Sequence, residues 1–84
     1  MKHKYSAIII EWEDSQISPQ GWERVSDFIA QIPIMKSIGF IVYEDKNCIS
    51  IASSLGMGTK TSDEQICNTI TIPKRSIVSK HFLK

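Results

Sequence analysis

Apolar and polar residues alternate with a period of two through much of the second half of this chain. Three segments carry the pattern, at residues 37–44, 48–53 and 66–72. This period places successive side chains on opposite faces of a strand, so each segment is predicted to be a half-buried β-strand. Pro73 cannot donate a hydrogen bond to a neighbouring strand, so the third strand is expected to end there.

The connections between these segments are of different lengths. Residues 45–47 (Asp-Lys-Asn) are typical of a short turn and predict a hairpin between the first two strands. Residues 54–64 predict a long, flexible loop, and residues 74–76 a tight turn. Residues 77–83 then favour a short fifth strand, with a helical turn as the alternative.

The first third of the chain combines a strand pattern with a helix pattern. Residues 5–13 predict a strand with apolar residues on both faces, which is typical of a strand covered at least in part on both sides. Residues 20–31 predict a short amphipathic helix, with Ser18 as N-cap, Pro19 at the first helical position and Pro33 just beyond its end. Its apolar face would carry Trp22, Val25, Phe28, Ile29 and Ile32.

These elements predict a single domain over residues 1–84. Its predicted fold class is mainly β, or α+β when the one short helix is counted. We expect a small bent antiparallel sheet, as an SH3-like five-strand barrel with the helix after the first strand plugging one open end. A flatter four-strand α+β sandwich is the alternative. A chain of 84 residues buries only about 60% of its surface, which argues against a nucleotide-binding α/β enzyme or a barrel enzyme.

Charge and cysteine content indicate the compartment and the partners. Ten basic and nine acidic residues leave a formal charge of +1, and only the C-terminal end is locally basic. Cys48 and Cys67 form no metal-binding pair. If residues near Ser53 and Ile66 pair across the loop, Cys67 lies opposite about Ala52 and Cys48 opposite about Thr71, too far apart for a disulfide. Two free thiols fit a reducing cytoplasm. No apolar run approaches 18 residues, so no membrane-spanning segment is expected.

Five different short motifs are spread over most of the chain. They lie at residues 11–14 (Glu-Trp-Glu-Asp), 21–22 (Gly-Trp), 38–44 (Ile-Gly-Phe-Ile-Val-Tyr-Glu), 52–54 (Ala-Ser-Ser) and 72–77 (Ile-Pro-Lys-Arg-Ser-Ile). Together they make the chain similar to a loose group of small proteins encoded by phages and prophages. The group's first motif is Trp-x-Asp or similar, and here Glu13 precedes Asp14. The resemblance implies phage origin, and proteins of that origin often bind host machinery without catalysing a reaction.

The residues that carry chemistry are few. A nucleophilic Cys or Ser needs an adjacent base, and only His3 and His81 are available. Glu11 and Glu13 share one strand face, but the chain has no calcium-loop spacing. Residues 56–61 lack the glycine spacing of a phosphate loop. We therefore expect no enzymatic activity, no catalytic or metal site and no cofactor.

The sequence thus favours an interaction module that binds a host protein stoichiometrically, for host takeover or inhibition of a defence enzyme. Binding is expected through open strand edges, which also invite a homodimer, and through the loop at residues 55–64. The predicted partner-binding residues are Trp12, Leu55, Met57, Lys60, Lys74 and Arg75.

Two alternatives remain open from the sequence. One is a nucleic-acid-binding small barrel that uses Lys74 and Arg75. The other is a small anionic ligand held by the amides of residues 56–61.

Overall fold

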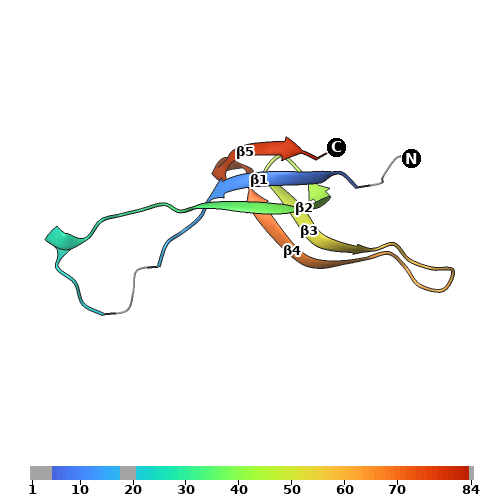
Figure 1. Ribbon diagram of the computed structural model, residues 1–84, viewed down its shortest axis with the longest axis horizontal. Coiled ribbons are helices and arrows are strands. Elements are labelled where there is room, and N and C mark those ends of the chain that lie inside the picture. The colour runs from blue at the N-terminus through green and yellow to red at the C-terminus, as the bar shows by residue number, and fades with distance from the viewer. Residues whose placement is uncertain (1–4, 18–20, 84) are drawn as a thin grey trace.

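Five antiparallel strands form one open sheet in the order β4-β3-β2-β1-β5 (Figure 1). This computed structural model describes residues 5–17 and 21–83. All the predicted strands are found. The last of them is a strand, as favoured, and not the helical turn that was the alternative for residues 77–83. Their bounds are β1 Ala7–Glu13, β2 Ile34–Glu44, β3 Cys48–Gly56, β4 Gln65–Pro73 and β5 Ile77–Phe82. Two short 3₁₀ turns lie between them, η1 Val25–Asp27 and η2 Lys74–Ser76.

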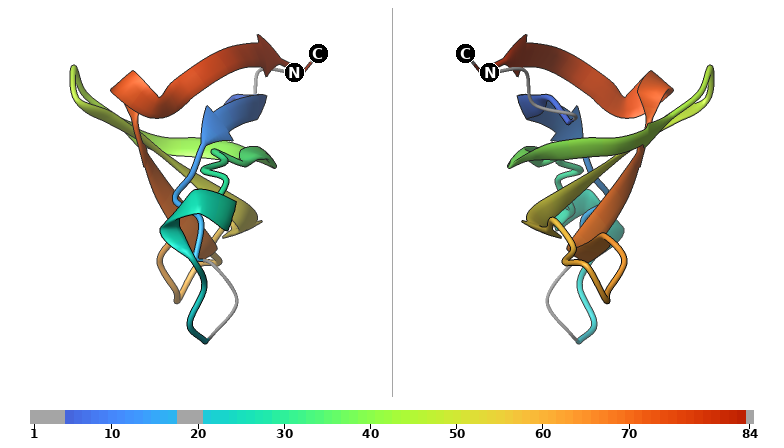
Figure 2. Two further views of the ribbon diagram at one scale, coloured as in Figure 1. Left: turned by 90° about the vertical axis from the view of Figure 1, so that its left-hand side faces the viewer. Right: turned by 90° about the vertical axis from the view of Figure 1, so that its right-hand side faces the viewer.

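The sheet is strongly bent. The register of β1 against β5 shifts between Glu11 and Trp12, and that of β2 against β3 shifts between Ile41 and Tyr43. Such bulges bend a strand and increase its twist. β4 and β5 are the two edge strands of the sheet, yet only the three residues of η2 connect them. The sheet is therefore curled so that its two edges come together at η2 (Figure 2).

The core is made of isoleucine side chains on the inner face of the bend. Ile8 and Ile10 of β1, Ile49 and Ile51 of β3 and Ile72 of β4 are each at most 2% exposed. β2 lies between β1 and β3, so these side chains meet across the fold of the sheet. Burial of each one contributes roughly 1.5–3 kcal/mol. Partly buried side chains pack against this cluster from Trp12, Ile41, Ile70 and Ile77.

The amphipathic helix predicted for residues 20–31 is wrong. The described part of that segment contains only the three-residue η1, and its apolar side chains are exposed. A helix of about 12 residues is marginal in water without a surface to pack on, and the inner face of the sheet is already filled by isoleucine. The α+β sandwich is excluded with it. Ser18 and Pro19 lie outside the described residues. No helix in the described ranges has the length and apolar character needed to cross a membrane.

The loop between β3 and β4 is shorter than predicted. β3 runs on to Gly56 and β4 begins at Gln65, which leaves residues 57–64 as the connection. The pairing therefore differs by two residues from the expected one, with Cys67 opposite Ser54 and Cys48 opposite Pro73. Both thiols are free.

Candidate functional site

Five of the six predicted partner-binding residues, all except Trp12, fall into two groups at opposite ends of the β3–β4 ladder. Leu55 pairs with Ile66 at one end, whereas Lys74 and Arg75 follow Pro73 at the other end. About seven residues of ladder separate the two ends, a distance of roughly 23 Å. These residues therefore do not form one site.

The first group surrounds the projecting end of the β3–β4 hairpin. Met57 is 61% exposed and Ile66 is 50% exposed, while Leu55 is half-buried. Lys60 is exposed in the connecting loop. A shallow cavity of about 170 Å³ opens here, lined by Tyr5, Leu55, Gly56, Met57, Glu64, Gln65 and Ile66.

Sequence reasoning missed Tyr5 and Ile66 as members of this surface. The two-residue error in the pairing concealed Ile66, which the correct register places opposite Leu55. Tyr5 precedes β1 and carries no periodic signal.

The loop at residues 57–64 is held by its own hydrogen bonds. Thr59 donates its amide to the carbonyl of Ser62 at 3.0 Å. Its Oγ1 accepts hydrogen bonds from the amides of Thr61 and Ser62, at 3.2 and 3.1 Å. Two amides of the expected anion cradle, those of Thr59 and Thr61, are thus used internally, so this loop does not offer them to a ligand.

The second group lies where η2 packs against the β2–β3 turn. The amide of Lys74 donates to the carbonyl of Asn47 at 2.8 Å, and its Nζ lies 2.7 Å from Glu44 Oε2. This contact lowers the pKa of Glu44. An open cleft of about 350 Å³ is lined by Lys46, Asn47, Pro73, Lys74 and Arg75. Sequence reasoning missed Lys46, because only the structure brings the turn against η2.

Asp45 organises the β2–β3 turn. Its carboxylate accepts hydrogen bonds from the amides of Asn47 and Cys48, at 2.8 and 2.9 Å, and from Tyr43 Oη at 2.9 Å. The Asn47 amide, followed by the Tyr43 hydroxyl, lowers the pKa of Asp45 to about 2. The hydrogen bond to Asp45 raises the pKa of Tyr43. Burial, and then Asp45, raises the pKa of the Cys48 thiol, which makes it a poorer nucleophile at neutral pH.

Trp12 belongs to the core rather than to either exposed group. Its side chain is half-buried, packs against the isoleucine cluster and donates from Nε1 to Ser37 Oγ at 3.0 Å. It lies opposite Ile77, directly after η2. Any contact that Trp12 makes with a partner would therefore be at the same end of the sheet as Lys74 and Arg75.

The carboxylates and histidine of the described residues are dispersed. Glu11 Oε1 accepts a hydrogen bond from Ser79 Oγ at 2.9 Å, which ties β1 to β5. His81 lies opposite Ile9 on β5, with β1 and β2 between it and Cys48 in the sheet order. No group of three or more His, Cys, Asp or Glu in the described ranges is placed to hold a metal ion.

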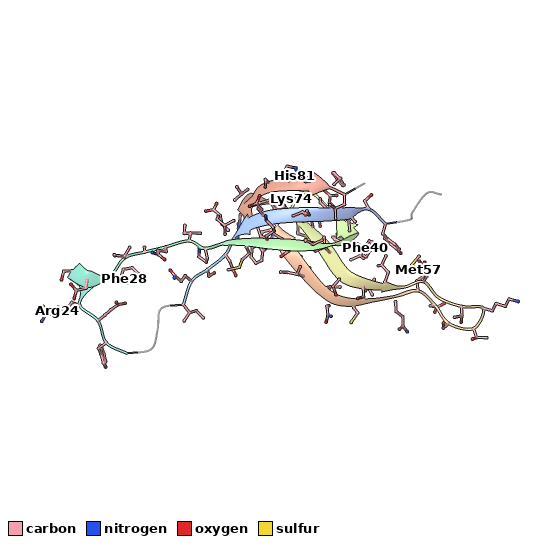
Figure 3. The ribbon with its side chains drawn as sticks, viewed as in Figure 1. Arg24, Phe28, Phe40, Met57, Lys74 and His81 are labelled. Carbon is pink, nitrogen blue, oxygen red and sulfur yellow. The ribbon has the colours of Figure 1, made fainter. Side chains whose placement is uncertain are left out.

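An apolar arm connects β1 to β2. We use this name, the β1–β2 arm, for residues 14–33, of which 14–17 and 21–33 are described. It projects from the sheet at the end opposite the β3–β4 hairpin (Figure 1). Arg24 and Phe28 lie near its far end, on the other side of the molecule from Met57 (Figure 3). The large apolar side chains exposed on it are Ile17, Trp22, Val25, Phe28, Ile29 and Ile32.

Sequence reasoning missed the arm as a functional candidate, because the helical spacing of its apolar residues predicts that they belong to the core. The length of the arm is the one feature that indicates a function, because irregular loops beyond about 12–15 residues are uncommon in small domains and usually functional.

Comparison with protein families, curated proteins and solved structures finds no match to this chain.

Proposed function

We propose that this chain is a non-enzymatic interaction module of phage origin that binds a host protein stoichiometrically in the host cytoplasm. The observation that carries the proposal is the apolar surface at the end of the β3–β4 hairpin. Met57 and Ile66 are each at least half exposed there, beside the cavity of about 170 Å³. Exposed apolar side chains on a projecting hairpin, held by a rigid sheet, are typical of a protein-binding surface.

The hairpin surface suits a protein partner in its chemistry as well. Met57 is an unbranched, adaptable side chain that fits uneven apolar surfaces. Lys60 adds a positive charge in the loop, and the exposed Asp63 and Glu64 follow it in the same loop, so charged residues adjoin the apolar ones. A partner that buries Met57 and Leu55 would exclude water from the centre of the contact. Occupying a functional surface of a host enzyme in this way would inhibit it without any chemical step.

An SH3-like barrel is the architecture that we propose for this module. Support comes from five antiparallel strands of which the last returns to pair with the first. The bulges at Glu11/Trp12 and Ile41/Tyr43 provide the bends, and η2 brings the two edge strands together at one end. A sheet curled in this way encloses a single small core between its two halves.

The placement of the reactive side chains supports a non-enzymatic role. The raised pKa of Cys48 leaves little thiolate at neutral pH, and His81 lies on a strand that does not adjoin β3. Glu11 is engaged by Ser79, and Asp45 by the turn that it organises. The carboxylates of Glu11 and Asp45 are thus used to hold β1 against β5 and to form the β2–β3 turn.

The test is affinity capture from host cells with the tagged chain and its variants. Met57→Ser combined with Ile66→Thr should abolish capture of the partner, because both side chains are exposed and contribute little to the fold. Val78→Thr, which changes an apolar side chain of similar exposure on β5, is the matched control and should capture normally. A partner captured equally by all three chains would place binding elsewhere. The ratio of the purified complex should be one partner per binding chain.

Nucleic-acid binding is a second candidate, favoured by the cleft that Lys46, Lys74 and Arg75 line. Glu44 offsets one of these charges through its contact with Lys74, which weakens the candidate. Its test is the salt dependence of binding to single-stranded RNA or DNA. If these residues neutralise phosphates, Lys46→Glu with Arg75→Glu should reduce the slope of log affinity against log salt by about one for each phosphate that is no longer neutralised. The absence of binding at low salt would exclude this candidate.

A further inference from the structure

The chain exposes far more surface than a compact domain of its mass. Its accessible surface is 7246 Å², whereas a folded monomer of 9.5 kDa exposes roughly 5,000 Å². Its radius of gyration is 17.4 Å, against roughly 12 Å for a compact chain of this length. The excess is therefore roughly 2,200 Å² for each chain. The β1–β2 arm and the β3–β4 hairpin account for the elongated shape, 61 Å along its longest axis.

The β1–β2 arm carries the largest uncovered apolar side chains. Trp22 is fully exposed, and Val25 and Ile29 are 93% and 75% exposed. Uncovered aromatic and aliphatic side chains concentrated on one segment mark an interaction surface rather than a solvated loop.

The base of the arm directs it away from its own sheet. Glu13 still pairs with Ile34, and one step further the amide of Asp14 donates to the carbonyl of Pro33 at 3.0 Å. These contacts continue the pairing of the two chain segments beyond the ends of β1 and β2. The arm thus leaves the sheet at the ends of these strands and projects away from it (Figure 1).

The outer face of the sheet has uncovered apolar residues that match the arm. Ile8 and Ile10 fill the inner face, so Ile9 and its cross-strand partner Ile38 lie on the outer one. Ile38 is 59% exposed. The sequence of β1 is apolar on both faces, as in a strand covered on both sides, yet among the described residues the outer face leaves Ile38 exposed and Ile9 only half-buried.

Charge distinguishes two ways in which copies of the chain could associate. Asp14, Glu23, Arg24 and Asp27 give the β1–β2 arm a formal charge of −2, so the rest of the chain carries +3 within the total of +1. Two arms packed on each other would bring like charges together, whereas the outer face beside Ile9 and Ile38 carries Glu11 and Lys36, which are of opposite sign and do not repel the arm as a second arm would.

We infer that the chain forms a homodimer in which the β1–β2 arm of each copy packs on the outer face of β1 and β2 of the other. The excess of both chains, roughly 4,400 Å², is an upper bound on what the dimer buries, because the β3–β4 hairpin contributes part of it. Half of this bound is still above the roughly 1,200–2,000 Å² of a standard stable interface. The exchange is reciprocal, as a two-fold interface requires. It does not depend on partner binding at the β3–β4 hairpin, which lies at the opposite end of the molecule.

The mass of the purified chain in solution is the first test. Sedimentation and light scattering from low micromolar concentration upward should give twice the chain mass. Trp22→Ser with Phe28→Ser should give the single-chain mass with a cooperative melt retained. Loss of a buried Trp alone weakens an interface roughly 30-fold or more. Met57→Ser, at the other end of the molecule, is the matched control and should remain dimeric.

The fluorescence emission of Trp22 reports whether its indole is buried in the dimer. In a Trp12→Phe background, its emission should shift to the blue and become protected from iodide quenching as the concentration rises through the dimer transition. A constant, fully quenchable emission alongside a dimeric mass would show that the arm stays in water, and would overturn the inference.

A mixing experiment identifies the surface that receives the arm. Ile38→Glu, or the milder Ile38→Thr if folding suffers, should also give monomers by itself. Mixed with the arm variant, it should form heterodimers, because the intact arm of one chain meets the intact sheet of the other.

Three further results would contradict this arrangement. Failure of the mixture to associate would indicate arm-to-arm contact, and a dimer that survives both variants would indicate pairing through the edges of β4 or β5. A compact wild-type monomer would show that the arm folds back on its own sheet.

Discussion

Trp12 of β1 donates a hydrogen bond from its indole Nε1 to Ser37 Oγ of β2, at 3.0 Å, and so joins two residues separated by the whole β1–β2 arm. The indole also packs against the isoleucine cluster. One side chain thereby closes the core and fixes the base of the arm. Because Ser37 is half-buried, loss of the indole leaves its hydroxyl without this partner.

This relationship predicts non-additive effects of mutation. Trp12→Phe should lower the free energy of unfolding by about 1–2 kcal/mol, since it removes the donor and some buried surface. Ser37→Ala should cost about 1 kcal/mol. The double variant should cost less than the sum by about 0.5–1 kcal/mol in urea denaturation. Strictly additive costs would show that the hydrogen bond contributes nothing to stability.

Gly39 and Gly56 should respond very differently to the same substitution. A Cβ at Gly39 would lie 2.7 Å from the carbonyl oxygen of Ala52 and 3.2 Å from Ile51 Cβ, so the β2–β3 backbone must shift. We expect Gly39→Ala to cost about 1–3 kcal/mol, as overpacking does. At Gly56 the nearest atoms lie 3.7 Å away, so Gly56→Ala should change stability by no more than about 0.5 kcal/mol. Equal effects of the two substitutions would contradict the close approach of β2 and β3.

The strands were predictable because one physical cause dominates them. A half-buried strand needs alternating apolar residues, and Ile49, Ile51 and Ile72 show this directly. The ends were harder to predict. Ser54 and Gly56 have low strand propensity, yet pairing with β4 keeps them in β3. The end of β3 was therefore expected too early in the sequence, and the expected register with β4 was wrong by two residues.

The β1–β2 arm could not be predicted from periodicity. Its apolar residues recur at helical spacing, but a helix forms there only if a surface receives its apolar face. Whether Ile8 and Ile10 leave room for it depends on how far the sheet bends, and the bulge at Glu11/Trp12 that sets the bend has no sequence signal of its own. The same reason concealed the cleft between Lys46 and η2, which depends on tertiary contact.

The two thiols should differ in reactivity. Cys67 is exposed on β4, whereas burial and the neighbouring Asp45 raise the pKa of Cys48. Titration with a thiol reagent should find two thiols without reductant, in a fast and a slow phase. Cys67→Ser should remove the fast phase and leave the slow one, because the exposed thiol is freely accessible to the reagent, whereas the raised pKa of Cys48 slows its reaction. A single phase in the wild-type chain, or no reaction at all, would contradict the environments described.

Asp45 should make stability depend on pH at the acidic end. Its pKa is about 2 in the folded chain, below the ordinary 3.8, because the Asn47 amide and the Tyr43 hydroxyl stabilise the carboxylate. A group whose pKa is lowered by folding contributes stability that is fully present above its unfolded pKa and is lost as the pH falls through the folded value. This contribution should therefore be complete above about pH 5 and should decline toward pH 2.

Comparison of Asp45→Asn with the wild-type chain isolates this effect. The difference between their free energies of unfolding should be constant from pH 5 upward and should shrink toward pH 2, because protonation removes the charge that the variant lacks. Tyr43→Phe is the matched control: it removes one donor and keeps the two amides, so the Asp45 pKa should rise only part of the way to its ordinary value. Carboxyl NMR titration measures this pKa directly. A wild-type midpoint at the ordinary value would show that the turn does not hold Asp45 as described.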